Sequence, residues 1–568
     1  MWLRYTRTGH CVTCPHAHLP GDPLKTTRLG FPSLMALAFL IAAAIGAFAM
    51  IQAQSFSAGF SGADEPSHFL NGYFISSYLQ HHFGSNPMAF ATDFYIHYPK
   101  ISIGHWPPAY YGLLSLNFLL FPATYMSAFV WNVLVAALPA FGIAAALFRL
   151  AGRRAALAGV VVFALTPLAL EGQALFMVDQ PLAATLVAAT AVWIAYAQRP
   201  TWGRALAFAA ISALAVLIKG NGWIALFIPL YQIALTGTWR RLLSLRLAVA
   251  AVLGAVLVVP WYLLTAKIAA DGFNYQAGIG YAMKALAANT VFLADNISWA
   301  GVALALYAGV AEFRARQAAP LRWTIVSGVI SLVLATFTLQ SIVPVDIVDR
   351  YVAPALPAVV VLAVLGAVRL LALLPLAYGR WRLPAGAVLA LLMVWGGVHH
   401  LLQRVPKADV GNLAITEQLT PGAIPSVTVI DGRSGDEGAF IATMAVHDPK
   451  LQSYVVRASK LFADSNFMGS KYALKYQDQA SVVAELRRLG VRNIVLIRAN
   501  HLSAFPHSEQ LRQALAQPGS GYRLSERVDH RNRDGVTEVY VAVQPVTPNI
   551  PAVRALGIPA KANALVKS

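Results

Sequence analysis

Two adjacent carboxylates, Asp64 and Glu65, follow the first strongly apolar segment of the chain and precede Pro66, which opens a short predicted helix. Charged side chains beside a lipid bilayer are costly, and for this reason they commonly mark a functional site. Two like charges this close also tend to raise the pKa of one carboxyl, which suits a general base near neutral pH. The alternative is a structural role, because acidic residues and proline both favour the first turn of a helix.

Three further ionisable residues lie at the ends of apolar segments: Asp179, Lys219 and Arg350. Asp179 could contact a substrate or a metal ion, or only cap its helix. Lys219 could bind an anion, or only extend from the end of a span to the interface. Arg350 could do the same, or pair with Asp346 or Asp349. The elements that carry these residues must bring them to one side of a membrane before they can act together.

The composition is that of a polytopic membrane protein. Of the 568 residues, 57% are hydrophobic and 12% are charged, and the mean hydropathy is +0.58. These values do not fit a soluble globular protein. The net charge of +18 would suit nucleic-acid binding in a soluble chain, but here the basic residues form short clusters between apolar segments, as cytoplasmic loops do. We therefore exclude a nucleic-acid partner.

Residues 1–30 are predicted to form a cytoplasmic tail. Cys11 and Cys14 are the two cysteines of the chain, so no disulfide framework supports the rest. With His16 and His18 they provide ligand types that zinc accepts, but their spacing is more typical of an ordinary extension. The apolar segment from Phe31 to about Ile51 is long enough to cross a membrane and too long for a signal peptide.

Clusters of arginine predict the topology of residues 31–403, because short cytoplasmic loops are rich in basic residues. Between consecutive clusters the chain is long enough for two spans, so the hairpin tips that carry Asp179, Lys219 and Arg350 should share the outer side with Asp64. We expect about eleven transmembrane helices. The clusters are Arg149, Arg153 and Arg154; Arg199 and Arg204; Arg240, Arg241 and Arg246; Arg314, Arg316 and Arg322; Arg380 and Arg382.

The first outer loop, residues 52–122, is predicted to hold two juxtamembrane helices. The apolar stretch from Pro107 to Phe121 would reach only about 22 Å as a helix, too short to span. The stretch 69–78 places aromatic residues at helical spacing, as interfacial helices do. Asp64 and Glu65 would then begin the first of these two helices.

Residues 404–568 are predicted to form a small extracytoplasmic α/β domain with a flexible C-terminal tail. A strand at 426–430, a glycine-rich turn at 431–438 and a helix to about 446 follow the order of an α/β unit. The turn lacks the fingerprint of the common phosphate-binding loops, which favours a plain surface turn. Further strands are expected at 453–456, 493–497, 522–528 and 537–543, and a helix at 481–489.

Several motifs of residues 31–403 resemble those of the C-type glycosyltransferases, in particular the protein O-mannosyltransferase and aminoarabinose transferase group. That group has an Asp-Glu pair at the start of one juxtamembrane helix and a His-Pro-Pro or Lys-Pro-Pro element at the start of the next. Here Trp106 separates His105 from the two prolines, and the nearest lysine is Lys100. The matching stretches are Asp64-Glu65, His68-Phe69, Ser77-Tyr78, the segment 104–111, Met177-Val178-Asp179, Leu217-Ile218-Lys219-Gly220 and the segment 349–357.

The resemblance implies transfer of a hexosyl or pentosyl group from a polyprenyl-phosphate donor to a lipid, glycan or protein acceptor. Such a reaction needs a base for the acceptor hydroxyl and cations for the departing phosphate. Asp64 is the expected base, with Glu65 as its neighbour or as a metal ligand. The expected substrate-binding residues are His105, Tyr110, Asp179, Lys219, Arg350 and Tyr351. A divalent cation is an expected cofactor, with no metal ligand set assigned, and a nucleotide cofactor is not expected.

The expected location is a bacterial-type inner or plasma membrane, with the active site outside the cytoplasm and membrane lipids as further partners. Another class of function is a multi-span transporter or a flippase for lipid-linked sugars. Transporters tend to hold polar residues near the middle of the bilayer and to show repeated halves. Here the ionisable residues gather at one face and no internal repeat is evident, which favours transfer over transport. A polymerase or ligase of surface glycans would share the donor chemistry and differ only in its acceptor.

Overall fold

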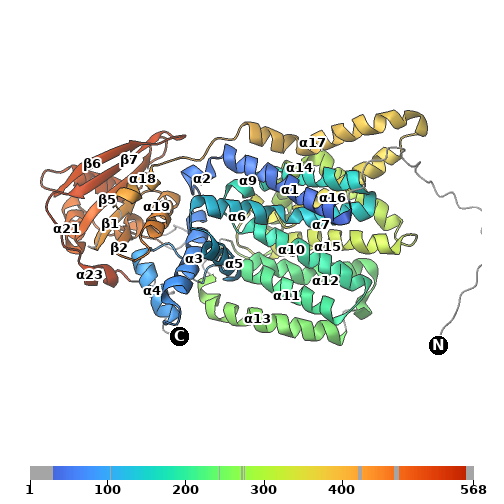
Figure 1. The fold of residues 1–568 in the computed structure, drawn as a ribbon, viewed down its shortest axis with the longest axis horizontal. Helices are drawn as coiled ribbons and strands as arrows, with labels where there is room; N and C mark the ends of the chain where they lie inside the picture. Colours follow the sequence, from blue (N-terminus) through green and yellow to red (C-terminus); the bar gives the residue numbers. More distant parts are fainter. Residues whose placement is uncertain are drawn as a thin grey trace, which may run out of the picture.

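The computed structural model describes residues 30–102, 104–241, 244–269, 273, 275–419, 425–465 and 472–557. The expectations for Cys11, Cys14 and the C-terminal tail fall outside these residues. The described chain forms a long helical bundle with a smaller sheet domain at one end (Figure 1). We call this end of the bundle the domain-proximal end.

Helices occupy all eleven positions at which the sequence predicts a span. Within the described residues, seven helices are long and apolar enough to cross a membrane, or eight if the pair α8 and α9, bent by 60°, counts as one span. Helices α11 and α16 are apolar but shorter, and α12 contains Pro229. The bundle consists of α1 (Phe31–Gln52), α6 (Tyr125–Ala137) with α7 (Pro139–Ala151), α8 (Arg153–Ala164) with α9 (Pro167–Ala174), α10 (Asp179–Gln198), α11 (Trp202–Ile218), α12 (Ile224–Thr236), α13 (Leu245–Ala269), α14 (Ile279–Arg314), α15 (Pro320–Ile342), α16 (Leu356–Ala372) and α17 (Arg382–Leu402).

The first outer loop contains the two expected helices as α3 (Glu65–Ser77) and α5 (Ala109–Leu120), which pack against each other. It also contains α2 (Ser55–Ala58), a π-helical turn η1 (Tyr78–His82) and α4 (Pro87–His97), which the sequence did not predict. Asn86 caps α4 by accepting hydrogen bonds from the backbone of its first turn. Nearly every residue of α3 is buried, because α5 and α19 pack against it.

The C-terminal domain is built on a five-stranded sheet of order β2-β1-β5-β7-β6, parallel between β1 and its two neighbours and antiparallel beyond β5. The predicted glycine-rich turn is shorter than expected, because α19 already begins at Ser434 with Asp436 and Glu437 in its first turn, where acidic residues stabilise a helix. The elements are α18 (Asn412–Leu419), β1 (Ser426–Asp431), α19 (Ser434–His447), β2 (Ser453–Arg457), α20 (Ala458–Leu461), β3 (Ala463–Asp464), β4 (Ala473–Leu474), α21 (Gln479–Leu489), β5 (Val491–Ala499), α22 (Pro506–Ala516), β6 (Tyr522–Asp529), β7 (Gly535–Ala542) and α23 (Ile550–Ala555).

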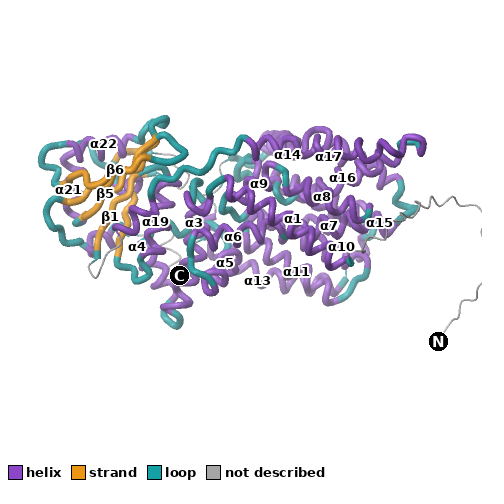
Figure 2. The backbone as a smooth tube through the Cα atoms, turned by 45° about the horizontal axis from the view of Figure 1, so that its top comes forward, coloured by secondary structure: helices purple, strands orange, loops and turns teal. Residues whose placement is uncertain are grey.

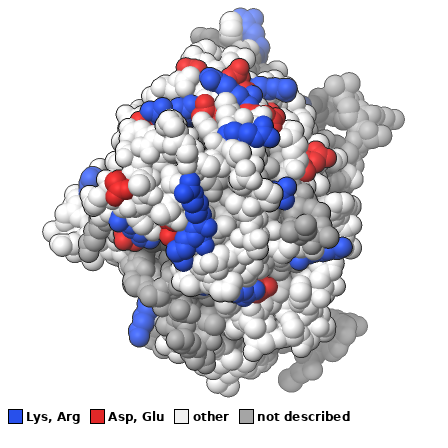
Figure 3. All heavy atoms as spheres, turned by 90° about the vertical axis from the view of Figure 1, so that its left-hand side faces the viewer, with Lys and Arg blue, Asp and Glu red and all other residues white. Residues whose placement is uncertain are grey.

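Helix α19 lies between the sheet and α3, so the C-terminal domain covers the first outer loop (Figures 1 and 2). Buried polar contacts join the two parts. Tyr98 donates a hydrogen bond to Asp448 at 2.6 Å, and a ring nitrogen of His97 lies 2.8 Å from Ser453 O. The face of the domain that points away from the bundle carries interspersed basic and acidic side chains (Figure 3). The domain thus binds the loop on one side and presents a charged surface on the other.

Candidate active site

Asp64 lies at the N-cap of α3, but its side chain does not cap the helix. Its Oδ2 atom instead accepts a hydrogen bond from Nη2 of Arg350 at 3.2 Å, across 286 positions of sequence. About a third of each side chain is exposed, 33% for Asp64 and 35% for Arg350. The carboxylate is therefore held by a cation and stays accessible, which a base for an external hydroxyl requires.

A second acid and a second cation lie beside this pair. Lys219 follows the last residue of α11, and its Nζ atom donates to Oδ1 of Asp179, the first residue of α10, at 2.5 Å. The Nζ atom also lies 4.7 Å from the centre of the Tyr351 ring. Burial opposes the charge of Arg350, but Asp179 and Asp64 together raise its pKa above its ordinary value. The four charged groups thus form one electrostatic cluster at the domain-proximal end.

Asp64 stays ionised near neutral pH. Burial alone would raise its pKa, but nearby cationic groups hold the pKa below its ordinary value: His68, Arg350, Lys219 and Lys100. Burial lowers the pKa of His68 to about 4 and that of Lys100 to about 7, so near neutral pH the stabilising field comes mainly from Arg350 and Lys219. This differs from the expectation that a neighbouring acid would raise the pKa of one carboxyl.

Aromatic rings enclose the side of the site next to α3. The Nδ1 atom of His68 lies 2.8 Å from the Tyr111 hydroxyl, and the ring of Trp106 packs at 4.6 Å from that of His68. Trp106 is the residue that separates His105 from the two prolines, and His105 itself is half-buried in the turn before it. The departure from the expected motif therefore adds an aromatic wall beside the charged cluster.

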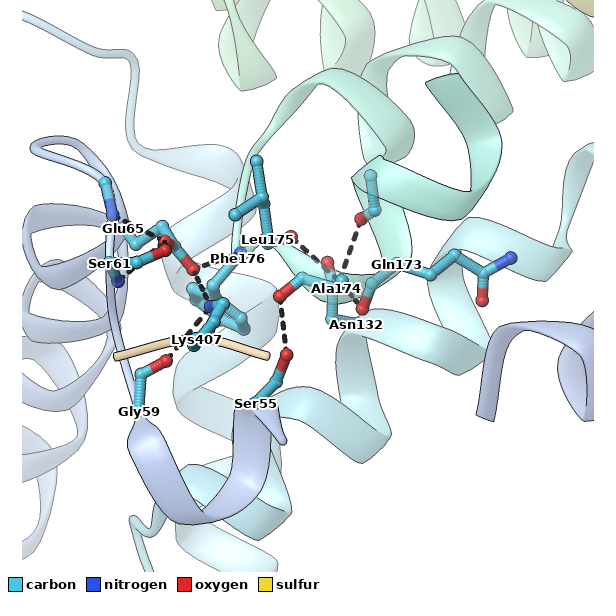
Figure 4. Close-up of polar contacts among 12 residues, drawn as sticks. Ser55, Gly59, Ser61, Glu65, Asn132, Gln173, Ala174, Leu175, Phe176 and Lys407 are labelled. Atoms are coloured by element: carbon cyan, nitrogen blue, oxygen red, sulfur yellow. Dashed lines mark hydrogen bonds and ion pairs between the residues drawn. The ribbon is translucent and has the colours of Figure 1, made fainter. Parts of the chain in front are cut away.

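Glu65 does not take the place expected for a catalytic residue or a metal ligand. It is completely buried, and its Oε1 atom accepts hydrogen bonds from the backbone nitrogens of Ser61 and Gly62 at 3.0 and 2.8 Å. Its Oε2 atom accepts from the backbone nitrogen of Phe176 and from Nζ of Lys407, both at 2.8 Å (Figure 4). Because protein donors occupy both oxygens, Glu65 serves to join three segments of chain.

Tyr110, which was expected to bind substrate, lies in the core of the first outer loop. It is 1% exposed, and its ring packs against Tyr111 and Phe176 in the core of the first outer loop. A ring in this position cannot reach a substrate without rearrangement of the loop. Tyr351, by contrast, lies against Lys219 as described above, so it belongs to the site.

Two lysines of the site region were not among the expected substrate-binding residues, although Lys100 was noted as the lysine nearest to the two prolines. Lys407 follows α17 in an irregular segment, and its partner Glu65 is 342 positions away. Lys100 is buried where α19 meets the loop, with Nζ 3.4 Å from Ser434 O, and burial together with the charge of Arg457 lowers its pKa to about 7. A single lysine close to an apolar run is the weak sequence signal that could have drawn attention to either residue, because lysine is seldom buried without a partner.

The described residues do not offer a ready site for the expected divalent cation. They contain no group of three or more His, Cys, Asp or Glu side chains that could hold a metal ion. Asp179 Oδ2 is buried and lacks a hydrogen-bond partner among the described residues, but it is a single oxygen beside a lysine.

Comparisons with known proteins agree with this architecture. Residues 105–264 match the family described as dolichyl-phosphate-mannose-protein mannosyltransferase. None of the curated proteins matches the chain in sequence.

Two solved structures share the fold. ArnT from Cupriavidus metallidurans bound to undecaprenyl phosphate is 17% identical, with a TM-score of 0.54 over 89% of this chain and 98% of that chain. The Archaeoglobus fulgidus oligosaccharyltransferase in its apo form is 12% identical, with a TM-score of 0.55 over 82% of this chain and 69% of that chain. These findings confirm the resemblance seen in the motifs. The chain therefore has the C-type glycosyltransferase fold, and its residues 105–264 carry the sequence pattern of the dolichyl-phosphate-mannose-protein mannosyltransferase family.

Proposed function

We propose that this protein is an integral membrane glycosyltransferase that moves a sugar from a polyprenyl-phosphate donor to a hydroxyl-bearing acceptor. The observation that carries this proposal is the contact of Asp64 with Arg350, beside the pair formed by Asp179 and Lys219. One accessible carboxylate and two cations lie together at one end of a bundle of apolar helices. This arrangement contains a base for the acceptor and positive charge for a phosphate leaving group.

The reaction follows from these positions. Asp64 accepts the proton of the acceptor hydroxyl while the hydroxyl oxygen forms a bond to the anomeric carbon of the sugar. The bond between that carbon and the phosphate oxygen breaks, and the polyprenyl phosphate leaves with one more negative charge. Arg350 and Lys219 gain interaction with the phosphate as this charge develops, so they stabilise the transition state more than the bound donor.

The choice of donor draws support from the comparisons. The solved ArnT structure holds undecaprenyl phosphate, and the matching family is named for dolichyl-phosphate mannose. Both compounds are lipid phosphates. The sugar can be a hexose or a pentose, and the acceptor a lipid, a glycan or a protein, so an assay must offer all of these.

The decisive experiment incubates purified protein with radiolabelled polyprenyl-phosphate hexoses and pentoses and a panel of acceptors, and follows the label. We expect label to move covalently to one acceptor class, and the Asp64→Asn variant to lose this transfer. Repeating the assay with a chelator tests whether a divalent cation takes part. Label that crosses the membrane of a vesicle while still attached to its lipid would contradict transfer and favour the transporter alternative.

The site is proposed to face the outside of the cytoplasm. The arginine clusters lie at the opposite ends of the spans from Asp64, as the positive-inside rule would place them. A reporter that works only outside the cytoplasm should therefore be active when fused after Arg404 and inactive when fused near Arg241. The reverse pattern would place the site on the cytoplasmic side.

A further inference from the structure

A separate cavity of about 620 Å³ opens at the domain-proximal end of the bundle, where α9, α14 and α17 meet. Its lining includes Glu171 of α9, Asp295 of α14, and three residues at the end of α17 and just beyond it: His399, His400 and Arg404. The four charged residues of the candidate active site are not among the lining residues. Ser61 and Lys407, both hydrogen-bonded to Glu65, also line the cavity, so it adjoins the candidate active site without holding any of its four charged groups.

Irregular backbone surrounds this cavity. Helix α14 is interrupted at Ser298, which has φ 62° and ψ 160°, and the chain bends by 60° between α8 and α9. A non-glycine residue in this conformation is strained, and such strain commonly persists at functional sites. At membrane depth, irregular backbone is tolerated only inside protein or along a cavity. Two interruptions at one cavity indicate a built site.

Helix α17 approaches these interruptions through two adjacent glycines. A Cβ atom on Gly397 would lie 1.4 Å from Leu165 O, and a Cβ atom on Gly396 would lie 3.1 Å from Asp295 O. No other residue at position 397 would permit this contact. The close approach fixes the end of α17, with His399, His400 and Arg404, against the interrupted parts of α8, α9 and α14.

Charges of both signs line this cavity, and Glu171 lies near enough to Arg404 for their charges to interact. Among the described residues, neither Glu171 nor Asp295 has a side-chain hydrogen bond or an ion pair with another group, and Arg404 donates only to Leu170 O, at 3.2 Å. Burial lowers the pKa of Arg404, and the charge of Glu171 partly offsets this effect. Glu171 and Arg404 are half-buried, and such charges are costly unless they are paired, whereas Asp295 is exposed. A ligand that carries both a cation and an anion would pair them.

The mouth of the cavity borders apolar surface. Val405 lines the cavity and is 73% exposed, and Leu402 and Trp395 of α17 are 81% and 62% exposed. Exposed apolar side chains on a spanning helix contact lipid, and tryptophan favours the level of the head groups. A ligand that enters from this side is therefore an amphiphile, with its polar part in the cavity and its apolar part along α17.

We propose that this cavity binds the head group of a zwitterionic phospholipid with a primary ammonium, such as phosphatidylethanolamine. Arg404, His399 and His400 face the phosphate, and Glu171 and Asp295 face the ammonium. A primary ammonium has three N–H donors for two carboxylates, whereas a quaternary ammonium has none. This proposal does not depend on the proposed glycosyl transfer, because it concerns other residues.

The test uses the full-length protein, stripped of lipid in detergent, and measures binding of short-chain dihexanoyl phospholipids by thermal shift and native mass spectrometry. We expect phosphatidylethanolamine to bind at least about 10-fold more tightly than phosphatidylcholine or phosphatidylglycerol, a difference that one or two charge-assisted contacts supply. Glycerophosphoethanolamine, which lacks the tails, and inorganic phosphate should bind much more weakly. Equal binding of glycerophosphoethanolamine would contradict a lipid site.

Variants assign the binding to the cavity. Arg404→Gln, and Glu171→Gln combined with Asp295→Asn, should each weaken binding of phosphatidylethanolamine by about 10-fold or more, and Arg404→Lys should retain most of it. Arg382→Gln is the matched control, because Arg382 also donates to a carbonyl, Leu374 O, but at the other end of α17. The proposal fails if all three phospholipids bind equally, if the carboxylate variant binds like the wild type, or if the Arg382 control loses binding as well.

Discussion

Lys407 Nζ lies 2.8 Å from Glu65 Oε2 and 3.0 Å from Gly59 O, which ties the segment after the last span to the loop before Asp64. The same Glu65 oxygen accepts from the backbone of Phe176, three residues before Asp179 (Figure 4). One buried ion pair therefore helps to hold both segments that carry the acids of the candidate active site, Asp64 and Asp179. It also links them to the start of the C-terminal domain.

Lys407→Met should destabilise the protein strongly, because it leaves the carboxylate of Glu65 buried without its cation. Breaking a buried ion pair from one side typically costs about 3–5 kcal/mol. We expect a large drop in melting temperature, measured by fluorescence-detected size exclusion after heating, and a loss of turnover even where the protein stays folded. Lys450→Met is the control, because Lys450 is exposed in the C-terminal domain. If Lys407→Met melts like that control, the pair has no positioning role.

Asp64→Asn should abolish most activity and leave the fold intact. The side chain makes no cap hydrogen bond, and asparagine keeps its shape but cannot accept a proton. We expect a loss of at least about 10²-fold in kcat, the lower range for general bases. Because the pKa of Asp64 lies below its ordinary value, wild-type activity should fall on the acid side only below the ordinary pKa of an aspartate. Turnover of the variant close to that of the wild type would exclude Asp64 as the base.

The alternation of basic clusters predicted from sequence that Asp64, Asp179, Lys219 and Arg350 would share one end of the bundle, and they do. The alternation could not predict which of these charged side chains contact each other. Whether Lys219 meets Asp179 or a substrate phosphate depends on how α10 and α11 are rotated about their axes. That rotation is set by packing along their whole lengths, which no local motif encodes.

The role of Glu65 is a second feature that could not be predicted from the sequence. Two adjacent acids look equivalent in a motif, but consecutive residues at a helix start point in different directions, so Asp64 faces Arg350 and Glu65 faces the interior. The partner that decides this, Lys407, is 342 positions away. The cover that α19 provides over α3 likewise depends on contacts between distant segments, so the sequence did not predict it.

Arg350→Gln and Lys219→Met should each lower kcat by about 10-fold or more, because both cations are placed to stabilise a departing phosphate. Their effects on stability should differ. Arg350 is 35% exposed, so its loss should cost about 1 kcal/mol or less. Lys219 is buried against Asp179, so its loss leaves an unpaired buried carboxylate at a cost of about 3–5 kcal/mol.

A double variant separates these effects. Asp179→Asn combined with Lys219→Met should recover most of the melting temperature lost in Lys219→Met alone, because no unpaired charge remains. Its kcat should stay low. Steady-state kinetics with a short-chain donor and thermal melting of the same samples provide both measurements. Normal turnover in Arg350→Gln and in the double variant would show that other groups hold the donor phosphate.

Lys100 should make the stability of the protein depend on pH in the alkaline range. Its pKa is lowered from 10.5 to about 7 where it is buried beside Ser434 of α19. Between these two values the unfolded chain binds more protons than the folded protein, so the free energy of unfolding rises with pH from about 7 to about 10.

Lys100→Met removes this contribution, and its melting temperature should therefore exceed that of the wild type most at pH 6 and least at pH 9.5. Lys450→Met, an exposed control, should show no such trend. A difference between Lys100→Met and wild type that stays constant across this range would mean that Lys100 keeps its ordinary pKa, and that the contact between α19 and the first outer loop is not sensitive to its charge.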